Sequence, residues 1–594
     1  MNIDYKNIRE QIKLKIWDYI DIVNKVLQIF FIFVSVISIG VVLYYYGFPQ
    51  TAATLKFCDN IVVGSLFFYI LKYVLQCFFN RHSLDFLRKH WKQGIIIVLL
   101  IFWFILFYFI GSGGLFTGSG KIGNIIIFSI QAYFFILMLL ESSIGNIINK
   151  IKIGPSGLMI VSFLFLILVG TSLLLMPEMT VSKINFLDAF FTSTSVCCVT
   201  GLSIIDIKTT FSFKGQLIIM FLAQFGGINI LCFTSFLAYF YRGTKLRYQS
   251  VVKEMLNTTL QGSRKLIREI IIFTFIIEGI GFIFILIYLI VTQQNNGIFN
   301  NIFLSAFHTI SAFSNTGICL LKDELPSYVL QHNYYILVVM TIMSFLGGIG
   351  FFTIHDIFTN KQKTKNRWAN LQVSTKIVLQ LSGIIILFGM LSFFILEYNN
   401  VIASYSLKDK IFTSFFYAVT SRVAGFNTVD FSLLNMSTRL IFIVLMIIGT
   451  ASGSTGGGIK LTTFYILFKS AIATISGKKQ VTVFNKAISY DIVDKAYLVL
   501  LFSLSVIFIS TFALSISDPQ FSLEKIIFEV STAFSTVGLS IGVVANLSDF
   551  GKYVIIFVMY IGRITVLTLA LSITRRAFNR YSLATTNTGF LGNI

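Results

Sequence analysis

Four short polar segments, each ending in a glycine, interrupt the apolar stretches of this 594-residue chain. The glycines recur at nearly constant spacing, as Gly201, Gly317, Gly425 and Gly538, and an aromatic and hydroxyl-rich segment precedes each one. Irregular backbone at membrane depth is tolerated only where it is buried in protein or lines a water-filled path. Rings of backbone carbonyls can replace the hydration shell of a potassium ion. Four equivalent segments around one axis would form such a ring, so the repeat predicts a cation pore.

The two residues before each glycine are the predicted carbonyl donors. Their side chains differ from one segment to the next, which favours coordination by backbone atoms. Glycine suits such a segment because consecutive carbonyls that point one way need φ values that other residues reach only with strain. The alternative, that glycine merely permits close helix packing, accounts for one such glycine but not for four at equal spacing. The predicted filter, and the only predicted metal site, comprises Val199, Thr200, Gly201, Asn315, Thr316, Gly317, Val423, Ala424, Gly425, Thr536, Val537 and Gly538.

A run of small residues forms a second polar interruption, inside an apolar stretch that follows the third filter segment. Gly, Ser and Thr all cost helix stability, and six of them in succession predict a broken helix with a mobile loop below the filter. A small-residue packing motif is the alternative. The run consists of Gly453, Ser454, Thr455, Gly456, Gly457 and Gly458.

A few charged or titratable residues occur where the sequence is otherwise apolar. Arg563 lies near the centre of an apolar span, where a guanidinium is costly and is kept mainly for function; there it would repel cations and donate to carbonyls of the 453–458 loop. Lys460 either belongs to that loop or reaches for the cytoplasmic interface. Arg422, in the third filter segment, is expected to brace the filter. His308 and His355 are interpreted as satisfied polar residues rather than ligands.

The composition is that of a polytopic membrane protein, with 56% hydrophobic and 12% charged residues, whereas soluble chains carry about 25% charge. Runs of about 20 apolar residues predict spanning helices. Twelve such spans are expected, near 29–47, 58–79, 94–112, 123–142, 158–176, 216–240, 270–292, 335–354, 377–397, 437–468, 496–516 and 552–573. The six cysteines have neither paired nor metal-like spacing and are interpreted as buried thiols.

The predicted fold is all-α, with four helix–pore loop–helix repeats around one central pore and an extra four-helix block before them. The N-terminal block resembles a voltage sensor only faintly, because its fourth span, 122–140, has no Arg or Lys to move through the field. An accessory transmembrane bundle is favoured instead. The predicted domains are 1–150 (accessory block), 151–250 (repeat 1), 251–360 (repeat 2), 361–480 (repeat 3, with the small-residue loop) and 481–594 (repeat 4 and C-terminal tail).

The net charge of +21 does not indicate nucleic-acid binding. Basic residues gather in alternate loops, for example 242–268, 361–367 and 575–580, which is the positive-inside pattern. Both termini are therefore expected in the cytoplasm. The basic loops would bind either a cytoplasmic partner or anionic membrane lipid.

Several ordered motifs resemble the Trk/Ktr/HKT superfamily of potassium transporters, most of all its bacterial TrkH/KtrB branch. They are Gly425-Phe-Asn-Thr-Val-Asp430 after Ser421-Arg422, the run from Gly453 to Lys460, and Ile561-Gly562-Arg563. The resemblance covers about residues 150–580. The chain departs from it in its long first 150 residues, and at Ile564-Thr565-Val566, where glycine and proline are common.

The resemblance implies potassium uptake through a gated, channel-like pore in the cell inner membrane, with residues 453–458, Lys460 and Arg563 as the gate. It also implies a homodimer and a cytoplasmic ring of nucleotide-binding regulatory subunits, with potassium as the transported ion and no cofactor bound by this chain. Potassium symport with sodium or protons is the alternative. Coupled carriers often hold carboxylates at the midplane, and no Asp or Glu is evident deep in a span, Glu529 being the nearest candidate. The sequence shows no arrangement of nucleophile, general base or metal ligands that would indicate an enzyme.

Overall fold

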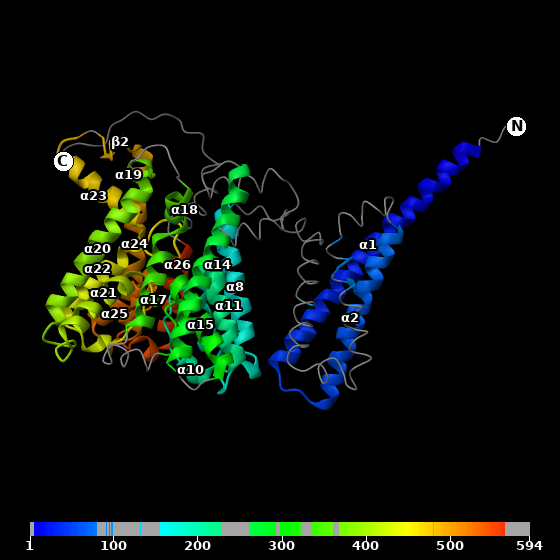
Figure 1. Cartoon of the computed structure of the whole chain (residues 1–594), viewed down its shortest axis with the longest axis horizontal. Helices are drawn as coiled ribbons and strands as arrows, with labels where there is room; N and C mark the ends of the chain where they lie inside the picture. The colour runs from blue at the N-terminus through cyan, green and yellow to red at the C-terminus, as the bar shows by residue number, and fades with distance from the viewer. Residues whose placement is uncertain are drawn as a thin grey trace. The chain divides into compact units, whose positions relative to one another are not determined.

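The computed structural model of the chain is predominantly helical (Figure 1). It describes residues 5–79, 91, 94–95, 97–98, 131, 155–228, 260–292, 297–321, 334–359, 367–478 and 480–564. The chain folds into two compact units. One comprises Met1–Lys152 with two short segments, 176–178 and 239–245, and the other comprises the remaining residues.

The first unit contains two long helices that pack on each other, α1 (Tyr5–Gly47) and α2 (Ala52–Phe79). Each has a stretch long and apolar enough to cross a membrane. Lys72 of α2 is only 5% exposed, and its ammonium lies 3.3 Å from the ring centroid of Phe31 in α1, a cation–π contact. The predicted third and fourth spans, and the segment considered for voltage sensing, lie almost entirely outside the described residues.

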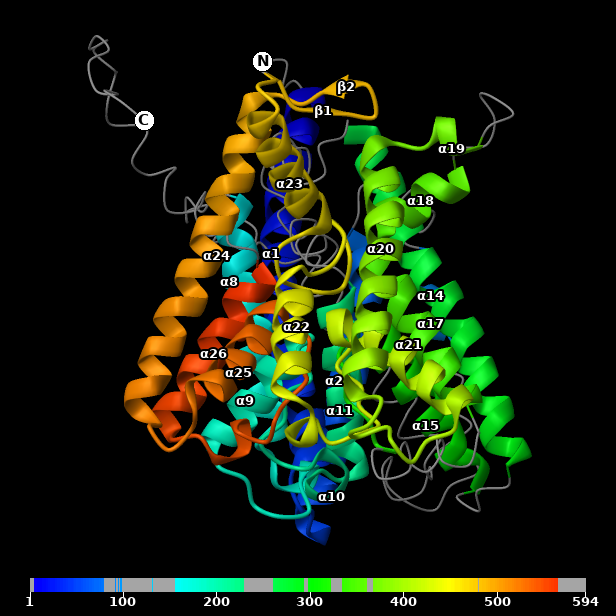
Figure 2. The ribbon, with the colours of Figure 1, turned by 90° about the vertical axis from the view of Figure 1, so that its left-hand side faces the viewer.

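The second unit contains four successive sets of three helices, each with a long first helix, a middle helix and a last helix (Figure 2). Apolar residues dominate the first helices, as expected for spans that face lipid. The sets are α8 (Pro155–Leu174), α9 (Phe186–Cys197) and α11 (Phe213–Gly227); α14 (Leu260–Val291), α15 (Gly297–Ser314) and α17 (Tyr335–Ile349); α20 (Val373–Glu397), α21 (Leu407–Val423) and α22 (Met436–Ile447); and α24 (Tyr490–Ser517), α25 (Leu523–Ser535) and α26 (Asp549–Ile564).

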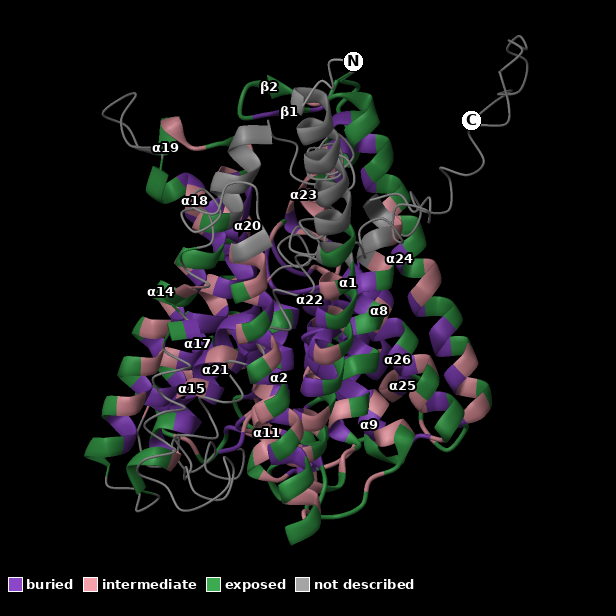
Figure 3. Cartoon of the chain, turned by 90° about the vertical axis from the view of Figure 1, so that its right-hand side faces the viewer, coloured by how far each residue is buried: buried purple, intermediate pink, exposed green. Residues whose placement is uncertain are grey.

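The sets pack in a closed cycle, in which the last helix of each set contacts the middle helix of the next. The contacting pairs are α11 with α15, α17 with α21, α22 with α25, and α26 with α9. Because the fourth set returns to the first, the four middle helices are brought together around one centre. In Figure 3 buried residues gather where α17, α21, α25 and α26 pack, and exposed residues lie on the outer faces.

Among the described residues, breaks follow two of the last helices, α17 and α22. The small-residue run lies between α22 and α23 (Leu461–Ile475), as its composition predicted. The expected continuous span 335–354 is wrong: it breaks at Gly350, where φ is +86°, and α18 (Phe351–Thr359) leaves α17 at 89°. A glycine with positive φ ends a helix readily, but nothing in the hydropathy distinguishes Gly350 from the glycines beside it.

Short elements lie within the sets and between them. They include α10 (Ile207–Thr210), α19 (Arg367–Asn370), three 3₁₀ turns at Pro177–Met179, Phe431–Leu433 and Val544–Asn546, and an antiparallel hairpin of β1 (Thr482–Val483) and β2 (Lys486–Ala487), in which Thr482 pairs with Ala487.

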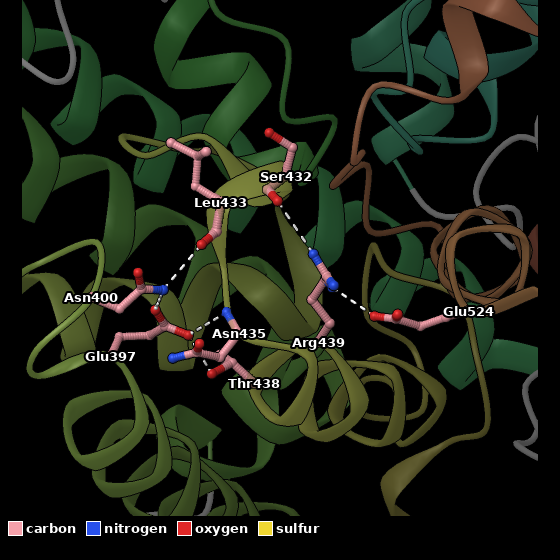
Figure 4. A network of polar contacts seen from close by, with 8 residues as sticks. All are labelled: Glu397, Asn400, Ser432, Leu433, Asn435, Thr438, Arg439 and Glu524. Atoms are coloured by element: carbon pink, nitrogen blue, oxygen red, sulfur yellow. Dashed lines mark hydrogen bonds and ion pairs between the residues drawn. The ribbon is translucent and has the colours of Figure 1, made fainter. Parts of the chain in front are cut away.

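A polar network fixes the ends of helices in the third and fourth sets (Figure 4). Glu397, at the end of α20, is fully buried and accepts hydrogen bonds from the Asn435 N–H (2.9 Å) and the Asn400 amide (2.7 Å). Arg439 of α22 forms an ion pair of 2.6 Å with Glu524, in the first turn of α25. The network therefore joins the last helix of the third set to the middle helix of the fourth.

Candidate ion-coordinating site and intramembrane loop

The four repeated glycines all adopt left-handed backbone, with φ of +79° at Gly201, +72° at Gly317, +66° at Gly425 and +93° at Gly538. Each directly follows the C-terminal end of a middle helix. Each also packs so closely on the neighbouring loop that an added Cβ would collide with a carbonyl oxygen there. The colliding pairs are Gly201 with Thr316, Gly317 with Ala424, Gly425 with Val537, and Gly538 with Thr200. The four loops therefore follow one another around a closed ring, and every glycine needs to be a glycine for two separate reasons.

Three of the middle helices end in the same way. Val199, Asn315 and Thr536 have φ of +58°, +63° and +52°. Asn adopts this conformation readily, but it is unfavourable for Val and Thr, whose side chains are branched at Cβ. The next N–H then bonds five residues back, as in Thr200 N to Ser195 O at 2.8 Å, which is the Schellman pattern of helix termination. Holding such residues in this region costs about 1–3 kcal/mol each. The surrounding packing must offset that strain.

The third loop turns differently. Helix α21 continues to Val423, Ala424 remains near helical conformation with φ of −112°, and the left-handed turn is made by Gly425 itself. Two N–H groups, of Ala424 and Gly425, share the carbonyl of Thr420, both at 3.0 Å. The ring is therefore closed but not fourfold symmetric.

The small-residue run forms a loop that is closed at its base. The N–H of Gly449 donates to the carbonyl of Ile459 at 3.0 Å, and the N–H of Ile459 donates to that of Ile447 at 3.1 Å. At the two outer positions, Gly453 and Gly458, φ is +76° and +72°. A loop with a hydrogen-bonded base can change conformation at its tip while the flanking helices α22 and α23 stay in place.

The tip of this loop contacts the ring directly. The N–H of Gly457 donates to the Thr536 hydroxyl at 2.7 Å. The Thr455 hydroxyl lies 2.5 Å from the Asn315 side chain; with the Asn315 oxygen facing Thr455, its amide nitrogen is placed 3.1 Å from the carbonyl oxygens of Ala312 and Ser344. Two loops of the ring, the second and the fourth, are thus bonded to the intramembrane loop through the side chains of left-handed residues.

Two predicted cationic residues bind carbonyl oxygens of the loop. Arg563, only 4% exposed, donates from Nη1 to the Thr455 carbonyl and from Nη2 to the Gly226 carbonyl. It therefore joins α26, the loop and the end of α11. Lys460 donates from Nζ to the Gly456 carbonyl at 2.6 Å, so its ammonium is held by the loop to which it belongs.

Arg422 contacts the base of the loop rather than the ring. Its guanidinium is 4% exposed and donates from Nη2 to the Gly449 carbonyl at 3.4 Å. Because Arg422 is in the last turn of α21 and Gly449 follows α22, this contact connects the third middle helix to the point where the loop begins.

Both histidines have hydrogen-bond partners within the protein, as predicted. His308 faces the Leu304 carbonyl with Nδ1 (2.7 Å) and accepts from the Leu320 N–H with Nε2 (3.2 Å); His355 bonds Glu269 at 2.8 Å. The described residues contain no group of three or more His, Cys, Asp or Glu side chains that could hold a metal ion.

The expectation that no acidic side chain lies deep in a span is wrong. Glu278 lies well inside the candidate span Arg268–Val291, is 7% exposed, and accepts from the Gln224 side chain at 2.9 Å. The local signal is a single Glu among isoleucines and phenylalanines, and one charge barely changes the mean hydropathy of a long span.

Comparison with known proteins finds matches over most of the chain. The profile of the family TrkH, described as cation transport protein, matches residues 151–579. The Ktr system potassium uptake protein B of Bacillus subtilis is 36% identical over 72% of this chain and 95% of its own length. The potassium/sodium uptake protein NtpJ of Enterococcus hirae is 32% identical over 72% of this chain and 94% of its own. The crystal structure of the potassium transporter TrkH from Vibrio parahaemolyticus covers 76% of this chain and 90% of its own, with a TM-score of 0.57 and 16% identity.

Proposed function

This chain belongs to the TrkH family of cation transport proteins, and from that premise we propose that it takes up potassium across the cell membrane through a gated, channel-like pore. It is a multi-pass membrane protein, since the family is one of membrane transporters and several of its helices are apolar enough to span a bilayer. The relatives carry the names of potassium uptake proteins. The proposal assigns the selectivity filter to the ring of four glycine loops.

The observation that carries this proposal is the closed contact between each glycine and the carbonyl before the next glycine. In such a ring the carbonyls of four loops approach one axis, and carbonyl oxygens are the ligands that replace potassium hydration. The side chains at the ring differ between loops, whereas the backbone turn recurs. Coordination by backbone oxygens explains both facts.

The gate is assigned to the intramembrane loop. Its tip is bonded to the side chains of Asn315 and Thr536 and to the guanidinium of Arg563. A positive side chain at that level repels cations, and the loop occupies the space beside the ring. Movement of the loop tip away from Arg563 would open the path.

Replacing any of the four glycines by serine tests the filter. We expect potassium and rubidium uptake to weaken and the preference over sodium to shrink by about tenfold or more, because a Cβ displaces a carbonyl of the adjacent loop and the backbone is strained. The measurement is rubidium and sodium uptake in a host that lacks its own potassium uptake, with the amount of protein in the membrane determined for each variant.

A matched control is Gly542→Ser. Gly542 has φ of +86° and follows the fourth loop, but an added Cβ there meets nothing within 4 Å. It therefore introduces backbone strain without the carbonyl collision. Unchanged uptake and selectivity in all four filter variants, or an equal loss in the control, would contradict the assignment.

Coupled symport with sodium or protons is the second candidate, and Glu278 is the observation that favours it. A nearly buried carboxylate inside a span is costly and is a candidate coupling site. Rubidium flux at clamped voltage, with and without sodium and at two pH values, separates the two. In the channel-like mechanism, voltage and the potassium gradient alone set the direction of flux. In the symport mechanism, a sodium or proton gradient drives rubidium against the rubidium gradient.

The remaining assignments extend this proposal. The positive-inside pattern of the basic loops supports cytoplasmic termini and a location in the inner membrane of the cell. We further propose that potassium is the transported ion and that the chain binds no cofactor. The residues before 151 form an accessory transmembrane block, and the following repeats have the boundaries predicted above. We expect a homodimer that carries a cytoplasmic ring of nucleotide-binding regulatory subunits, with anionic lipid as the alternative partner of the basic loops.

A further inference from the structure

Three of the four ring loops are tied to their own middle helix by a buried side chain that lies eight or nine residues before the loop glycine. In the second loop, His308 Nε2 accepts from the N–H of Leu320 at 3.2 Å. In the fourth, a carboxylate oxygen of Glu529 accepts from the N–H of Ile541 at 2.9 Å. His308 and Glu529 stand nine residues before their loop glycine, and the two donors stand three residues after it.

The third loop has the same kind of hydrogen bond, accepted by a third type of side chain. The Tyr417 hydroxyl accepts from the N–H of Thr428 at 2.8 Å, and Thr428 again stands three residues after the loop glycine, Gly425. Here the position nine residues before the glycine is Phe416, and the acceptor is the next residue along the helix. In the first loop, the corresponding Thr192 donates to the carbonyl of Asp188 (2.8 Å), and no side chain of α9 among the described contacts accepts from Ile204.

The three acceptors, called brace residues below, are buried as completely as any in the protein. His308 and Tyr417 are 0% exposed and Glu529 is 1% exposed. An imidazole, a phenol and a carboxylate share little except an acceptor atom that receives the N–H three residues after the loop glycine. Recurrence of the same bond with three chemistries indicates that the bond matters, not the residue type. A buried N–H without a partner is costly.

The tautomer of His308 follows from its two backbone partners; the Cys319 Sγ, 3.4 Å from Nε2, can donate to the same nitrogen. The Leu304 carbonyl can only accept, so Nδ1 carries the hydrogen, and the Leu320 N–H can only donate, so Nε2 must be unprotonated. The imidazole is therefore neutral and its acceptor is aimed at the loop. Glu529 is likewise aimed, because the same oxygen that receives the Ile541 N–H also receives the Ser540 hydroxyl at 2.7 Å.

These bonds hold the far end of each ring segment. The near end is already fixed by a backbone hydrogen bond to the end of the helix. The donor is the N–H of the residue before the glycine or of the glycine itself; for example, the Thr316 N–H donates to the Ser311 carbonyl at 2.9 Å. The brace adds a second attachment three residues beyond the glycine. Each segment that supplies the ring carbonyls is thereby held at both ends by one rigid helix.

We propose that His308, Tyr417 and Glu529 are positioning residues that set ion selectivity, by fixing the outer end of three filter segments. The proposal rests on the assignment of the ring as the filter. Carbonyls that can spread or contract accommodate sodium and potassium alike, so loosening one outer attachment loses discrimination before it loses transport. The first loop, which has no described brace, depends on its neighbours through the glycine–carbonyl contacts.

Tyr417→Phe is the sharpest test, because it removes one hydroxyl and leaves the ring in its aromatic surroundings. The ratio of sodium to rubidium uptake is measured in the potassium-uptake-deficient host and in proteoliposomes of the full chain. We expect this ratio to rise about fivefold, because the variant loses the buried hydroxyl that accepts from the Thr428 N–H and bonds the Thr428 hydroxyl at 3.2 Å. The unfolding temperature and membrane content should stay near those of the unchanged protein. Tyr553→Phe, in which the exposed Tyr553 of α26 loses the same hydroxyl, serves as the control and should not change the ratio.

Two substitutions at Glu529 separate the bond from the charge. Glu529→Gln keeps a carbonyl acceptor and should retain most of the discrimination; Glu529→Leu has no acceptor and should lose it. His308→Phe, which installs the residue that the third loop has at this position, should act as Tyr417→Phe does and supplies a further comparison should Glu529→Leu fail to fold.

A proportional loss of rubidium and sodium uptake in Tyr417→Phe, with an unchanged ratio, would overturn the proposal and leave the brace as a stability element. The same holds if Glu529→Gln and Glu529→Leu discriminate equally well. Failure of the proposed function is a distinct result: the unchanged protein would then show no preference for rubidium over sodium, and the four glycine variants would match it.

Discussion

Arg563 is a buried cation whose described partners are carbonyl oxygens, one on the intramembrane loop and one at the end of α11. No acidic side chain forms an ion pair with it in the described part of the chain, and a guanidinium is expensive at membrane depth unless its position serves a function. The two carbonyls come from segments that are far apart in the sequence. The side chain therefore both repels cations and holds the loop against a neighbouring helix.

Replacing Arg563 by alanine or glutamine should raise flux at saturating potassium by about tenfold. A charged hydrogen bond to the loop carbonyl is worth roughly 1.5–3 kcal/mol, and both this bond and the positive barrier are lost. Selectivity should change little, because the ring carbonyls are contributed by other residues. Rubidium uptake over a range of concentrations measures both quantities.

Arg563→Lys is the matched variant. It keeps the charge but lacks the planar fork that reaches two carbonyls at once, so its flux should lie between those of alanine and the unchanged protein. Normal membrane content of the alanine variant combined with unchanged or lower maximal flux would make Arg563 a structural anchor and exclude the gating role.

At the scale of helices and loops, the junctions between successive sets are built from different chemistry at similar places. Phe213 lies against Phe303 at the first junction, and Tyr334 against Phe412 at the second, with ring centroids 4.7 and 4.4 Å apart. The third and fourth junctions use ion pairs instead, Arg439 with Glu524 at 2.6 Å and Lys552 with Asp188 at 3.6 Å. The fourth set is therefore held by charge on both sides.

The Arg439–Glu524 pair (Figure 4) should contribute measurably to stability. Both side chains are largely buried, 14% and 18% exposed, so the pair is screened less than a surface pair. A double-mutant cycle with Arg439→Gln and Glu524→Gln should give a coupling of about 1–3 kcal/mol in the unfolding of the detergent-solubilised protein. A cycle on Lys552 and Asp549, where Asp549 is 82% exposed and 3.8 Å away, should give about 0–0.5 kcal/mol. Equal couplings in the two cycles would contradict the role of burial.

The intramembrane loop is an element of its own, and its deletion tests the gate. Removing Gly453–Gly458 leaves the hydrogen-bonded base between Gly449 and Ile459 but removes the contacts to Asn315, Thr536 and Arg563. Basal rubidium flux should rise several-fold, by about the factor expected for losing one or two charged or buried hydrogen bonds. It should also respond less to any regulator.

Thr455→Val is a milder form of the same test, since it removes only the hydroxyl beside Asn315. Ser452→Ala, which loses an exposed bond to Thr462, is its control. A deletion variant that reaches the membrane and conducts less than the unchanged protein would count against a gate in this loop.

At the scale of the whole molecule, the contacts of the ring and of the intramembrane loop given above join residues within 155–564. The family profile begins at residue 151, and the relative from Bacillus subtilis is matched over 95% of its length by 72% of this chain. The first unit is thus additional to the part that the relatives share.

A chain that begins at residue 151 should therefore retain uptake and ion preference. The closed cycle of four helix sets supplies both faces of every ring contact without help from the first unit. Rubidium and sodium uptake by the shortened and the full chain, normalised to membrane content, measures this. Loss of discrimination in a shortened chain that is present in normal amount would show that the first unit shapes the filter.

Much of this protein was determined by local sequence alone. Apolar runs predict spanning helices whatever they pack against. Gly201, Gly317, Gly425 and Gly538 mark the four turns at which the apolar sequence is interrupted. The break after α22 followed from six small residues in succession. These features depend on backbone propensity and on the cost of polar groups in lipid, which act over a few residues and are visible in one sequence.

Other features were decided only by tertiary structure. The order of loops around the ring, the different turn at Gly425, the sharp bend at Gly350 and the carbonyl partners of Arg563 depend on segments that are distant in sequence; Arg563 and Gly226 are 337 residues apart. His308, Tyr417 and Glu529 bond equivalent N–H groups although they share no residue type. A hydrogen bond selects an acceptor atom at a position in space, and packing of the helices, rather than any local pattern, sets which side chain supplies it.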